Sequence, residues 1–450
     1  MGRPSHAKAL GVWMNGLRVG TWRIPSRAPE EMVYDPAWVQ SDLFRPLSLS
    51  LPAPAGGGAL RGDVVAAYFD NLLPDNDTIR RRLQTRFRTG SLAPFDLLAA
   101  IGRDCVGAIQ LLPENEAPGP IDRIDGEPLD EQGVARELIR AATMPGPHIT
   151  HQAEDDELRI SIAGAQEKTA LLRHHGRWCR PRGTTPSTHI FKLPLGFVGN
   201  RQLDFATSVE NEWLCLKLLD AFGLAAAPAN IATFEDQKCL VVERFDRVLH
   251  SSGKYWLRLA QEDLCQATGT PGMRKYEKDR GPGILDLVAL LRHSENPGDI
   301  ERVLKTQVLF WMLRATDGHA KNFSITLKAG GRYCLTPAYD VLSVWPFVGT
   351  KKGQIPPQKV TLAMAWSGKT RHYHVDSIRV RHFIETARRC GFGDEMPGVL
   401  RALANQTTLA VESVAARLPD GFPAQIAEGV FKGLLGTAEI LAAGLDELRL

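Results

Sequence analysis

Cysteine is scarce in this sequence, and its cysteines are dispersed. Seven cysteines are spread over 450 residues, and no two of them are spaced as C-x-x-C. The spacing therefore gives no indication of a zinc ribbon or of a thioredoxin-like redox motif. An odd, scattered set is typical of a protein from a reducing compartment, where disulfides are rare.

Long apolar runs and a strong bias of charge are also absent. No apolar stretch is long enough to cross a membrane, and the first residues do not open a secretory signal, so we expect a cytoplasmic protein. The formal net charge is only +3, which permits contact with nucleic acid without arguing for it. Hydrophobic content of 44% and a length of 450 residues predict a globular protein of two to four domains.

Several familiar enzyme motifs are missing as well. The segment around Gly164 is not a Walker A loop, because Glu167 stands where that motif needs a second glycine, and it lacks G-x-G-x-x-G. Neither Ser161 nor Ser324 has the G-x-S-x-G context of a hydrolase nucleophile. No cluster of His, Cys and Glu has the spacing of a catalytic metal site. The sequence therefore does not indicate a P-loop NTPase, an α/β-hydrolase or a zinc enzyme.

One polar segment, Ala315 to Asn322, does carry a catalytic pattern. It lies between an apolar helical run and a strand-like run, and Asp317 and Asn322 are five positions apart (322 − 317). Kinase catalytic loops use that spacing, because the Asp accepts the substrate hydroxyl proton and the Asn holds Mg²⁺. A second acid, Asp340, follows, and Mg²⁺ prefers such hard oxygen ligands. The alternative interpretation is a helix that ends in an Asp-Gly turn with capping side chains.

The order of predicted elements indicates two lobes and an additional N-terminal part. We expect a hairpin at 12–22 around Asn15-Gly16, and a strand in the Leu47–Leu51 alternation. The predicted domains are an N-terminal α/β subdomain (1–115), a linker (116–130), a β-rich N-lobe (131–247) and a mainly helical C-lobe (248–450). The predicted fold class is α+β: a two-lobed protein-kinase-like fold with an extra small N-terminal α/β subdomain.

Four further features match the parts of a kinase, and each has an alternative. If Lys192 is buried in its strand it would need partners, and we expect a nucleotide phosphate together with Glu212 or Glu210 of the next helix. The alternative is that Lys192 faces solvent on an edge strand. The Gly164 segment could cover phosphates or form a plain hairpin turn. Glu243 to Phe245 could adjoin an adenine ring or end a strand, and His319 could be a ligand, a base or a local hydrogen-bonding residue.

Long motifs also resemble the HipA family, the serine/threonine kinase toxins of bacterial HipBA toxin–antitoxin modules. The resemblance covers nearly the whole chain. It is carried by 161–172, 189–194, 242–247, 261–266 and 315–324, and by the N-terminal segments 13–15, 46–52, 69–74 and 101–104. The segment 349–369 and the C-terminal end are less recognisable.

The resemblance implies roles for individual residues. Asp317 would be the catalytic acid, Lys192 would contact the ATP phosphates, and Asn322 and Asp340 would bind Mg²⁺. Ser161 would be autophosphorylated, which ejects the phosphate-covering loop and switches the kinase off. The residues expected to contact ATP are Ile162, Ala163, Gly164, Ala165, Gln166, Glu167, Lys192, Glu243, Phe245, His319 and Asn322.

The resemblance also implies partners. These are a HipB-like helix-turn-helix antitoxin, operator DNA reached through the antitoxin complex, and glutamyl-tRNA synthetase as the protein substrate. An alternative function is a corepressor that mainly stabilises an antitoxin–DNA complex, with secondary or lost kinase activity. Arg379, Arg381, Arg388 and Arg389 form a candidate DNA-contacting surface or simply a solvated helix face.

Overall fold

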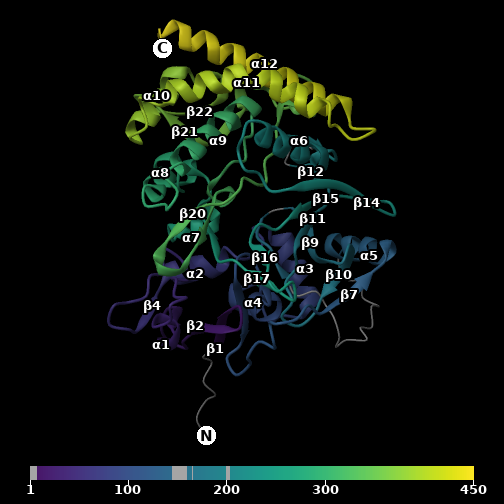
Figure 1. Cartoon of the computed structure of the whole chain (residues 1–450), viewed down its shortest axis with the longest axis vertical. Coiled ribbons are helices and arrows are strands. Elements are labelled where there is room, and N and C mark those ends of the chain that lie inside the picture. The colour runs from purple at the N-terminus through teal and green to yellow at the C-terminus, as the bar shows by residue number, and fades with distance from the viewer. Residues whose placement is uncertain (1–7, 144–159, 165, 199–202, 450) are drawn as a thin grey trace. The chain divides into compact units, whose positions relative to one another are not determined.

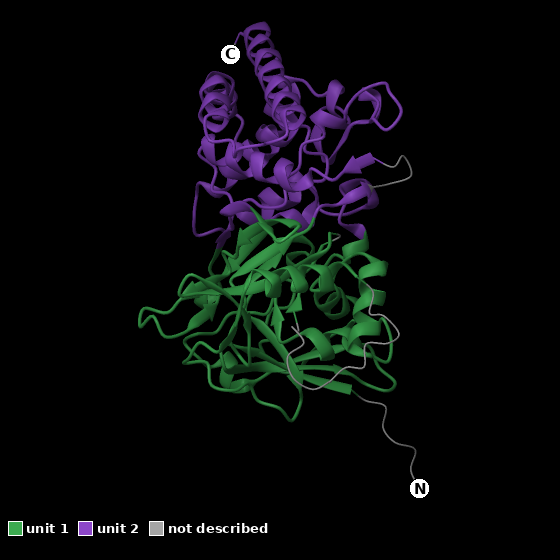
Figure 2. Ribbon diagram, turned by 90° about the vertical axis from the view of Figure 1, so that its right-hand side faces the viewer, with its two compact units in different colours: residues 1–193, 232–273, 324–333 green, residues 194–231, 274–323, 334–450 purple. Residues whose placement is uncertain are grey.

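The computed structural model describes residues 8–143, 160–164, 166–198 and 203–449 (Figure 1). These residues form two compact units, each built from several stretches of chain. Unit 1 comprises 1–193, 232–273 and 324–333, and unit 2 comprises 194–231, 274–323 and 334–450 (Figure 2, green and purple). Residues 248–273 and 324–333, which we expected in the C-lobe, thus belong to unit 1.

Unit 1 begins with a five-stranded sheet. The β1–β2 hairpin turns at Asn15 and Gly16, whose φ angles of 46° and 80° suit the type I′ turn predicted from this dipeptide. The strand order is β4-β3-β2-β1-β6, and α1 to α4 belong to the same part of the chain. The elements are β1 (Lys8–Met14), β2 (Leu17–Ile24), β3 (Glu31–Tyr34), α1 (Pro36–Val39), β4 (Ala59–Arg61), α2 (Asp63–Asp70), α3 (Asp77–Phe87), α4 (Pro94–Ile101) and β6 (Ile109–Pro113).

The strand expected at Leu47–Leu51 does not form. This segment is a turn whose polar groups bind a distant part of unit 1: the hydroxyls of Ser48 and Ser50 donate to the carbonyl of Gln266. The amide of Leu49 donates to the buried carboxyl of Glu262 at 2.9 Å, and burial raises the pKa of that carboxyl to about 8. Tertiary hydrogen bonds therefore replace the strand pairing that the alternation predicted.

The second sheet of unit 1 has six strands in the order β14-β15-β11-β9-β10-β7. Helix α5 packs on it, and Val134 and Leu138 of α5 share a core with Leu171, Phe191 and Val241 of the strands. The segment Gly126–Leu129, which we expected in the linker, is strand β7 and pairs with β10. The elements are β7, α5 (Glu131–Ala142), β9 (Lys168–His174), β10 (Arg177–Pro181), β11 (His189–Lys192), β14 (Ala229–Phe234) and β15 (Gln237–Glu243).

Short strands complete unit 1. β5 (Asp104–Cys105) pairs in parallel with β8 (Ile160–Ser161), so the chain before the phosphate-loop candidate is tied to the N-terminal part. β16 (Arg247–Leu249) pairs with β17 (Trp256–Arg258), and β18 (Gln261–Asp263) pairs with β19 (Ser324–Leu327). Helix α7 (Leu264–Ala267) follows β18 directly. Strand β20 (Tyr333–Leu335), which begins at the last residue of the 324–333 stretch of unit 1, continues the sheet of β19.

Unit 2 is mainly helical. Helix α9 (Asp299–Leu313) is buried at every residue from Val303 to Leu313 except one, as expected of a helix at the centre of a bundle. Helices α11 and α12 run side by side (Figure 1, yellow-green and yellow). The remaining elements are β12 (Gly196–Val198), β13 (Leu203–Phe205), α6 (Ser208–Ala221), α8 (Ile284–Leu291), β21 (Thr361–Ser367), β22 (Arg371–His374), α10 (Val380–Arg389), α11 (Met396–Ala415) and α12 (Ala424–Glu447).

Two features considered from the composition were the state of the cysteines and the presence of membrane-spanning helices. None of the seven cysteines, all of which lie in the described residues, forms a disulfide, and six of them are buried. Among the described residues, no helix combines the length and the apolar character that a membrane crossing requires.

Candidate active site

Asp317 lies in unit 2, just beyond the end of α9. Arg314 ends this helix in the left-handed region at φ 49°, which turns the chain into the loop. The Asp317 side chain is 62% exposed, so an incoming substrate can reach its carboxylate. A Cβ at the next residue, Gly318, would lie 2.4 Å from the ring of Phe310, so only glycine fits this close approach of the loop to α9.

Asn322 and Asp340 meet beside this loop. The amide nitrogen of Asn322 lies 3.1 Å from a carboxylate oxygen of Asp340, and its amide oxygen accepts the backbone N–H of His319 at 3.2 Å. Asn322 is buried, on the short 3₁₀ turn that follows His319. The structure therefore brings together two residues that the sequence placed eighteen positions apart.

The segment after Asp340 is fixed by hydrogen bonds to two helices, α6 and α9. Asn211 of α6 both donates to and accepts from the backbone of Ser343, each at 2.8 Å, and the Ser343 hydroxyl donates to the carbonyl of Leu313 at 2.6 Å. Asp340 itself has φ 59°, an uncommon conformation for a residue other than glycine. Such conformations persist where the surroundings over-determine them, and they cluster at functional sites.

The donor set of Asn322 and Asp340 suits a hard cation. Carboxylate and amide oxygens are the ligand types that Mg²⁺ takes, and this ion commonly uses one or two protein groups and completes its shell with water and phosphate oxygens. Within the part of the chain that the structure describes, no group of three or more His, Cys, Asp or Glu side chains is arranged for a metal ion. Asn322 and Asp340 supply the two ligand types named above and are the residues that could hold such an ion.

Two aromatic side chains flank Asp317. The hydroxyl of Tyr276 donates to Oδ1 of Asp317 at 2.5 Å, and the Tyr276 ring lies edge-on to His319, with ring centroids 5.1 Å apart. Nε2 of His319 is 4.0 Å from Oδ2 of Asp317, and the ring is buried. His319 thus lies in the same loop as Asp317, and its role as a ligand, a base or a local hydrogen-bonding residue stays a prediction.

Lys192 lies in unit 1, at the end of β11. This strand is central, between β15 and β9, and Lys192 is only 7% exposed, so the edge-strand alternative is wrong. Glu210 and Glu212 are buried on α6, which belongs to unit 2. The pairing of Lys192 with either glutamate would join the two units and stays a prediction.

The candidate phosphate-covering loop is held against the N-terminal part of unit 1. Gly164 forms a bridge with Pro74, and its carbonyl accepts the amide of Asp75 at 3.2 Å. Glu167 forms an ion pair with Arg82 of α3 at 2.7 Å. Gln166 donates to the carbonyl of Leu193, and Lys168 donates to that of Ala163. Ile162 is buried, and Ala165 lies outside the described residues.

Ser161 is completely buried. Its hydroxyl donates to the backbone carbonyl of Leu72 at 2.7 Å, and its strand pairs with β5. A phosphate on this oxygen would take the place of the hydroxyl proton. Its negatively charged oxygens would then lie against the carbonyl oxygen of Leu72. Arg159, which we considered as a cationic partner for such a phosphate, lies outside the described residues.

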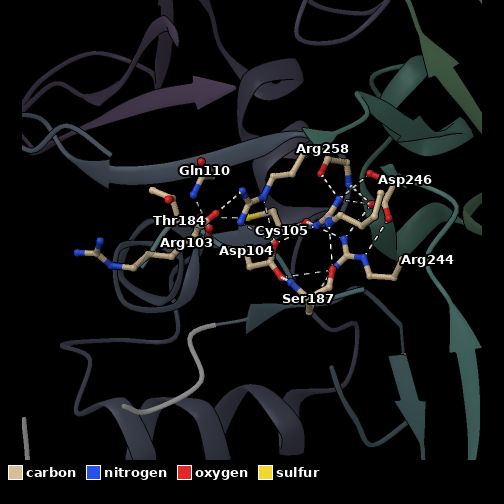
Figure 3. A network of polar contacts seen from close by, with 12 residues as sticks. Arg103, Asp104, Cys105, Gln110, Thr184, Ser187, Arg244, Asp246 and Arg258 are labelled. Atoms are coloured by element: carbon tan, nitrogen blue, oxygen red, sulfur yellow. Dashed lines mark hydrogen bonds and ion pairs between the residues drawn. The ribbon is translucent and has the colours of Figure 1, made fainter. Parts of the chain in front are cut away.

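The Glu243–Phe245 segment combines an exposed face with a buried one. Glu243 ends β15 and is exposed, and Phe245 is half-buried. The neighbouring side chains, Arg244 and Asp246, point into a buried network of polar contacts (Figure 3). This network also contains Asp104 of β5 and the hydroxyl of Ser187, and its members are all in unit 1.

The network holds three arginines and two aspartates with almost no exposure. Asp104 accepts from Arg247 at 2.9 Å and from Arg258 at 3.2 Å, and Asp246 binds Arg244 through both oxygens. The backbone carbonyl of Cys105 accepts from both Arg244 and Arg247, which disperses the surplus positive charge. Burial by itself would raise the pKa of Asp104, but the guanidinium groups around it outweigh burial and hold that pKa well below its usual range.

Sequence reasoning missed Tyr276 and the role of this network. Tyr276 is 41 positions from Asp317 and carries no motif of its own. Asp104, Arg244, Asp246 and Arg247 stand in segments that carry the family resemblance, but their mutual contacts span up to 143 positions. Charged residues at strand ends gave the one available signal, and that pattern also fits solvated surface residues.

Comparisons with known proteins agree on one family. The family model of the HipA N-terminal domain matches residues 10–112, and the model of the HipA-like C-terminal domain matches residues 160–418. A curated relative, the putative kinase Y4mE of Sinorhizobium fredii, is 33% identical over 423 residues, which cover 92% of each chain. The serine/threonine-protein kinase toxin HipA of Shewanella oneidensis is 28% identical over 355 residues and 76% of each chain.

A solved structure extends this similarity to the fold. The complex of Shewanella oneidensis HipA with HipB and its operator DNA contains a chain that matches with a TM-score of 0.78 and 25% identity, over 98% of this chain and 99% of that one. The predicted kinase-like fold with its added N-terminal part is confirmed. The chain belongs to the HipA family.

Proposed function

We propose that this protein is an ATP- and Mg²⁺-dependent serine/threonine kinase that acts as the toxin of a toxin–antitoxin module. The observation that carries the proposal is the arrangement in unit 2, where exposed Asp317 adjoins the contact between Asn322 and Asp340. A kinase needs these two features together: a carboxylate that a substrate can reach, and oxygen ligands for the nucleotide's metal.

The chain's residues would divide the chemistry as follows. Asp317 accepts the hydrogen bond of the substrate hydroxyl and orients it for in-line attack on the γ-phosphorus, whose bond to the leaving ADP oxygen breaks. Asn322 and Asp340 would hold the metal ion, which would offset the negative charge of the nucleotide phosphates. Lys192 contacts the phosphates, the Ile162–Glu167 loop covers them, and Glu243 and Phe245 adjoin the adenine. Catalysis then consists mainly of positioning and charge stabilisation.

The direct test is transfer of radiolabelled γ-phosphate from Mg-ATP to a purified protein. We propose glutamyl-tRNA synthetase as that substrate, so the assay compares it with an unrelated aminoacyl-tRNA synthetase. Transfer to glutamyl-tRNA synthetase alone supports the whole proposal. Transfer to other proteins supports the kinase and rejects the substrate. A protein that phosphorylates nothing, itself included, rejects the kinase.

A corepressor is the second candidate function, because a matching chain was solved in a complex with an antitoxin and operator DNA. We infer that a HipB-like antitoxin binds this protein and carries it to operator DNA. If repression is its main role, a variant without Asp317 should support operator binding as well as the wild type, and the wild type should transfer little phosphate.

Phosphorylation of Ser161 is predicted to inactivate the kinase. The Ser161 hydroxyl is fully buried against the Leu72 carbonyl, and a phosphate adds about −1.5 to −2 charges that cannot stay in this position. The strand and the following loop should therefore leave. Preincubation of the wild type with Mg-ATP should weaken nucleotide binding by about tenfold or more, the effect of removing a charge-assisted hydrogen bond to the phosphates. Isothermal titration and mass analysis of the Ser161 peptide give the two readouts.

A matched pair of alanine variants controls this experiment. Ser161→Ala should keep its ATP affinity after preincubation. Ser48→Ala also removes a buried serine hydroxyl that donates to a carbonyl, that of Gln266, yet it should still inactivate like the wild type. Complete phosphorylation of Ser161 with unchanged ATP affinity would show that the modification is not a switch.

Arg388 and Arg389 are the residues of the candidate DNA surface that we select for a test. Both end α10 and remain 67% and 44% exposed, although each also binds Glu385. If they neutralise DNA phosphates in the antitoxin complex, replacing both by Gln should reduce the slope of log affinity against log salt by about one for each arginine that binds a phosphate.

Operator binding over a range of salt concentrations measures this slope. Replacing both Arg401 and Arg417, two exposed arginines elsewhere in unit 2, by Gln controls for the loss of two positive charges. A double variant of Arg388 and Arg389 with the wild-type slope removes this end of α10 from the interface and leaves the solvated-face interpretation.

A further inference from the structure

The contact between Tyr276 and Asp317 resembles the contact that a substrate would make. The phenol donates to Oδ1 of the carboxylate at 2.5 Å, from a residue 41 positions earlier in the chain. In a kinase, the catalytic Asp accepts this same type of hydrogen bond from the hydroxyl of the substrate Ser or Thr. Tyr276 therefore occupies an acceptor site on Asp317 that a substrate hydroxyl requires.

The Tyr276 ring also lies near side chains other than that of Asp317. It lies edge-on to His319, and the ammonium groups of Lys275 and Lys278 lie 5.6 and 5.5 Å from its centre. The ring is only half-buried, and Tyr276 immediately precedes a three-residue 3₁₀ turn. The side chain can therefore rotate away from Asp317 without disturbing a packed core.

A cavity adjoins the two residues. It has a volume of about 260 Å³, and both Tyr276 and Asp317 line it. Its lining combines the polar side chains of Lys278, Thr316, Lys359 and Thr361 with apolar ones such as Val344 and Ile355. All of these residues lie in unit 2. This is less than the 300–1,000 Å³ of a typical small-molecule pocket, which favours one or two amino-acid side chains over a nucleotide.

We propose that the cavity receives the phosphoacceptor side chain of the protein substrate, and that Tyr276 holds Asp317 as a substitute for the substrate hydroxyl until that side chain displaces it. The inference rests on the proposed kinase function. Tyr276 is thus a positioning residue: it keeps the carboxylate in its catalytic orientation while no substrate is bound, and it competes with the substrate for the same oxygen.

The Tyr276→Phe variant separates this role from a purely structural one. It keeps the ring against His319 and removes only the competing hydroxyl. The KM for the acceptor should fall by about tenfold or more, in line with the loss of one competing hydrogen bond to a charged group, while kcat stays within about twofold. A fall in kcat with unchanged KM would instead show that the hydroxyl supports Asp317 during the reaction and does not compete with the substrate. This result would overturn the proposal.

The assay uses Mg-ATP with two acceptors, glutamyl-tRNA synthetase and a synthetic peptide of residues 156–168. Tyr373→Phe, which removes another hydroxyl of unit 2 outside the catalytic loop, should keep both wild-type constants. Mass analysis is done in parallel. Phosphate found on Tyr276 would make it an acceptor of the reaction and would also overturn the proposal.

A spectroscopic readout keeps the test independent of activity. The protein is labelled with 3-fluorotyrosine, and the ¹⁹F resonance of residue 276 is identified by its loss in Tyr276→Phe. This resonance should shift in Asp317→Ala, and it should shift in the wild type when the peptide is added with a non-hydrolysable ATP analogue.

If the wild type transfers no phosphate but the Asp317→Ala shift is seen, the kinase function fails and the contact stands. Transfer without either shift rejects the Tyr276 contact alone.

Discussion

Replacing Asp317 by Asn is expected to reduce phosphoryl transfer by at least about a hundredfold, the usual effect of removing one preorganised catalytic group. The amide oxygen of Asn can still accept the Tyr276 hydroxyl, and the exposed side chain packs against little, so the fold should be unaffected. What the variant lacks is a carboxylate able to take the proton of the attacking hydroxyl. Initial rates of γ-phosphate transfer under saturating Mg-ATP measure the effect.

Two controls make this result specific. Asp420→Asn neutralises another exposed aspartate of unit 2, in the loop between α11 and α12, and should transfer phosphate at the wild-type rate. The thermal midpoint and antitoxin binding of Asp317→Asn should equal those of the wild type. An Asp317→Asn protein as active as the wild type would remove Asp317 from the catalytic role and leave the corepressor as the better function.

Replacing Asp104 by Asn is expected to lower the free energy of unfolding by about 3–5 kcal/mol, the cost of removing one partner from a buried ion network. Asp104 is 5% exposed and contacts Arg247 and Arg258. Without its charge, Arg258 would lose its aspartate partner, and Asp246 alone would balance Arg244 and Arg247. Because the network joins β5 to the Glu243–Phe245 segment, the variant should also weaken ATP binding if that segment adjoins adenine.

Urea unfolding of the full chain at neutral pH measures this loss, with nucleotide affinity as the second readout. Glu116→Gln removes an exposed pair with Arg103, the neighbour of Asp104, and should change stability by no more than about 1 kcal/mol. A change of the same small size in Asp104→Asn would show that the network contributes no more than a surface pair.

The pH dependence follows from the direction of the Asp104 pKa. The folded pKa lies below the unfolded value of about 3.9, so the stability from this group is fully present above that value. It is lost as the pH falls below about 3.9 toward the folded pKa. The difference in stability between wild type and Asp104→Asn should therefore be constant near neutrality and shrink in acid.

The sequence by itself determined the features that depend on neighbouring residues. The Asn15-Gly16 hairpin follows from the φ angles these two residues tolerate, and the Asp317–Asn322 spacing is contained in one loop. The long HipA-like motifs identified the family and, through it, the two-lobed fold. These signals were readable because each is local or is a continuous stretch of specific residues.

Only the tertiary structure decided which distant residues meet. It buried Lys192 on a central strand, placed Ser161 against the Leu72 carbonyl 89 positions away, and brought Tyr276 to Asp317. It also turned the Leu47–Leu51 alternation into a turn that binds Gln266 and Glu262. These outcomes depend on desolvation and on hydrogen-bond partners supplied by other elements, and periodicity along one segment carries no information about either.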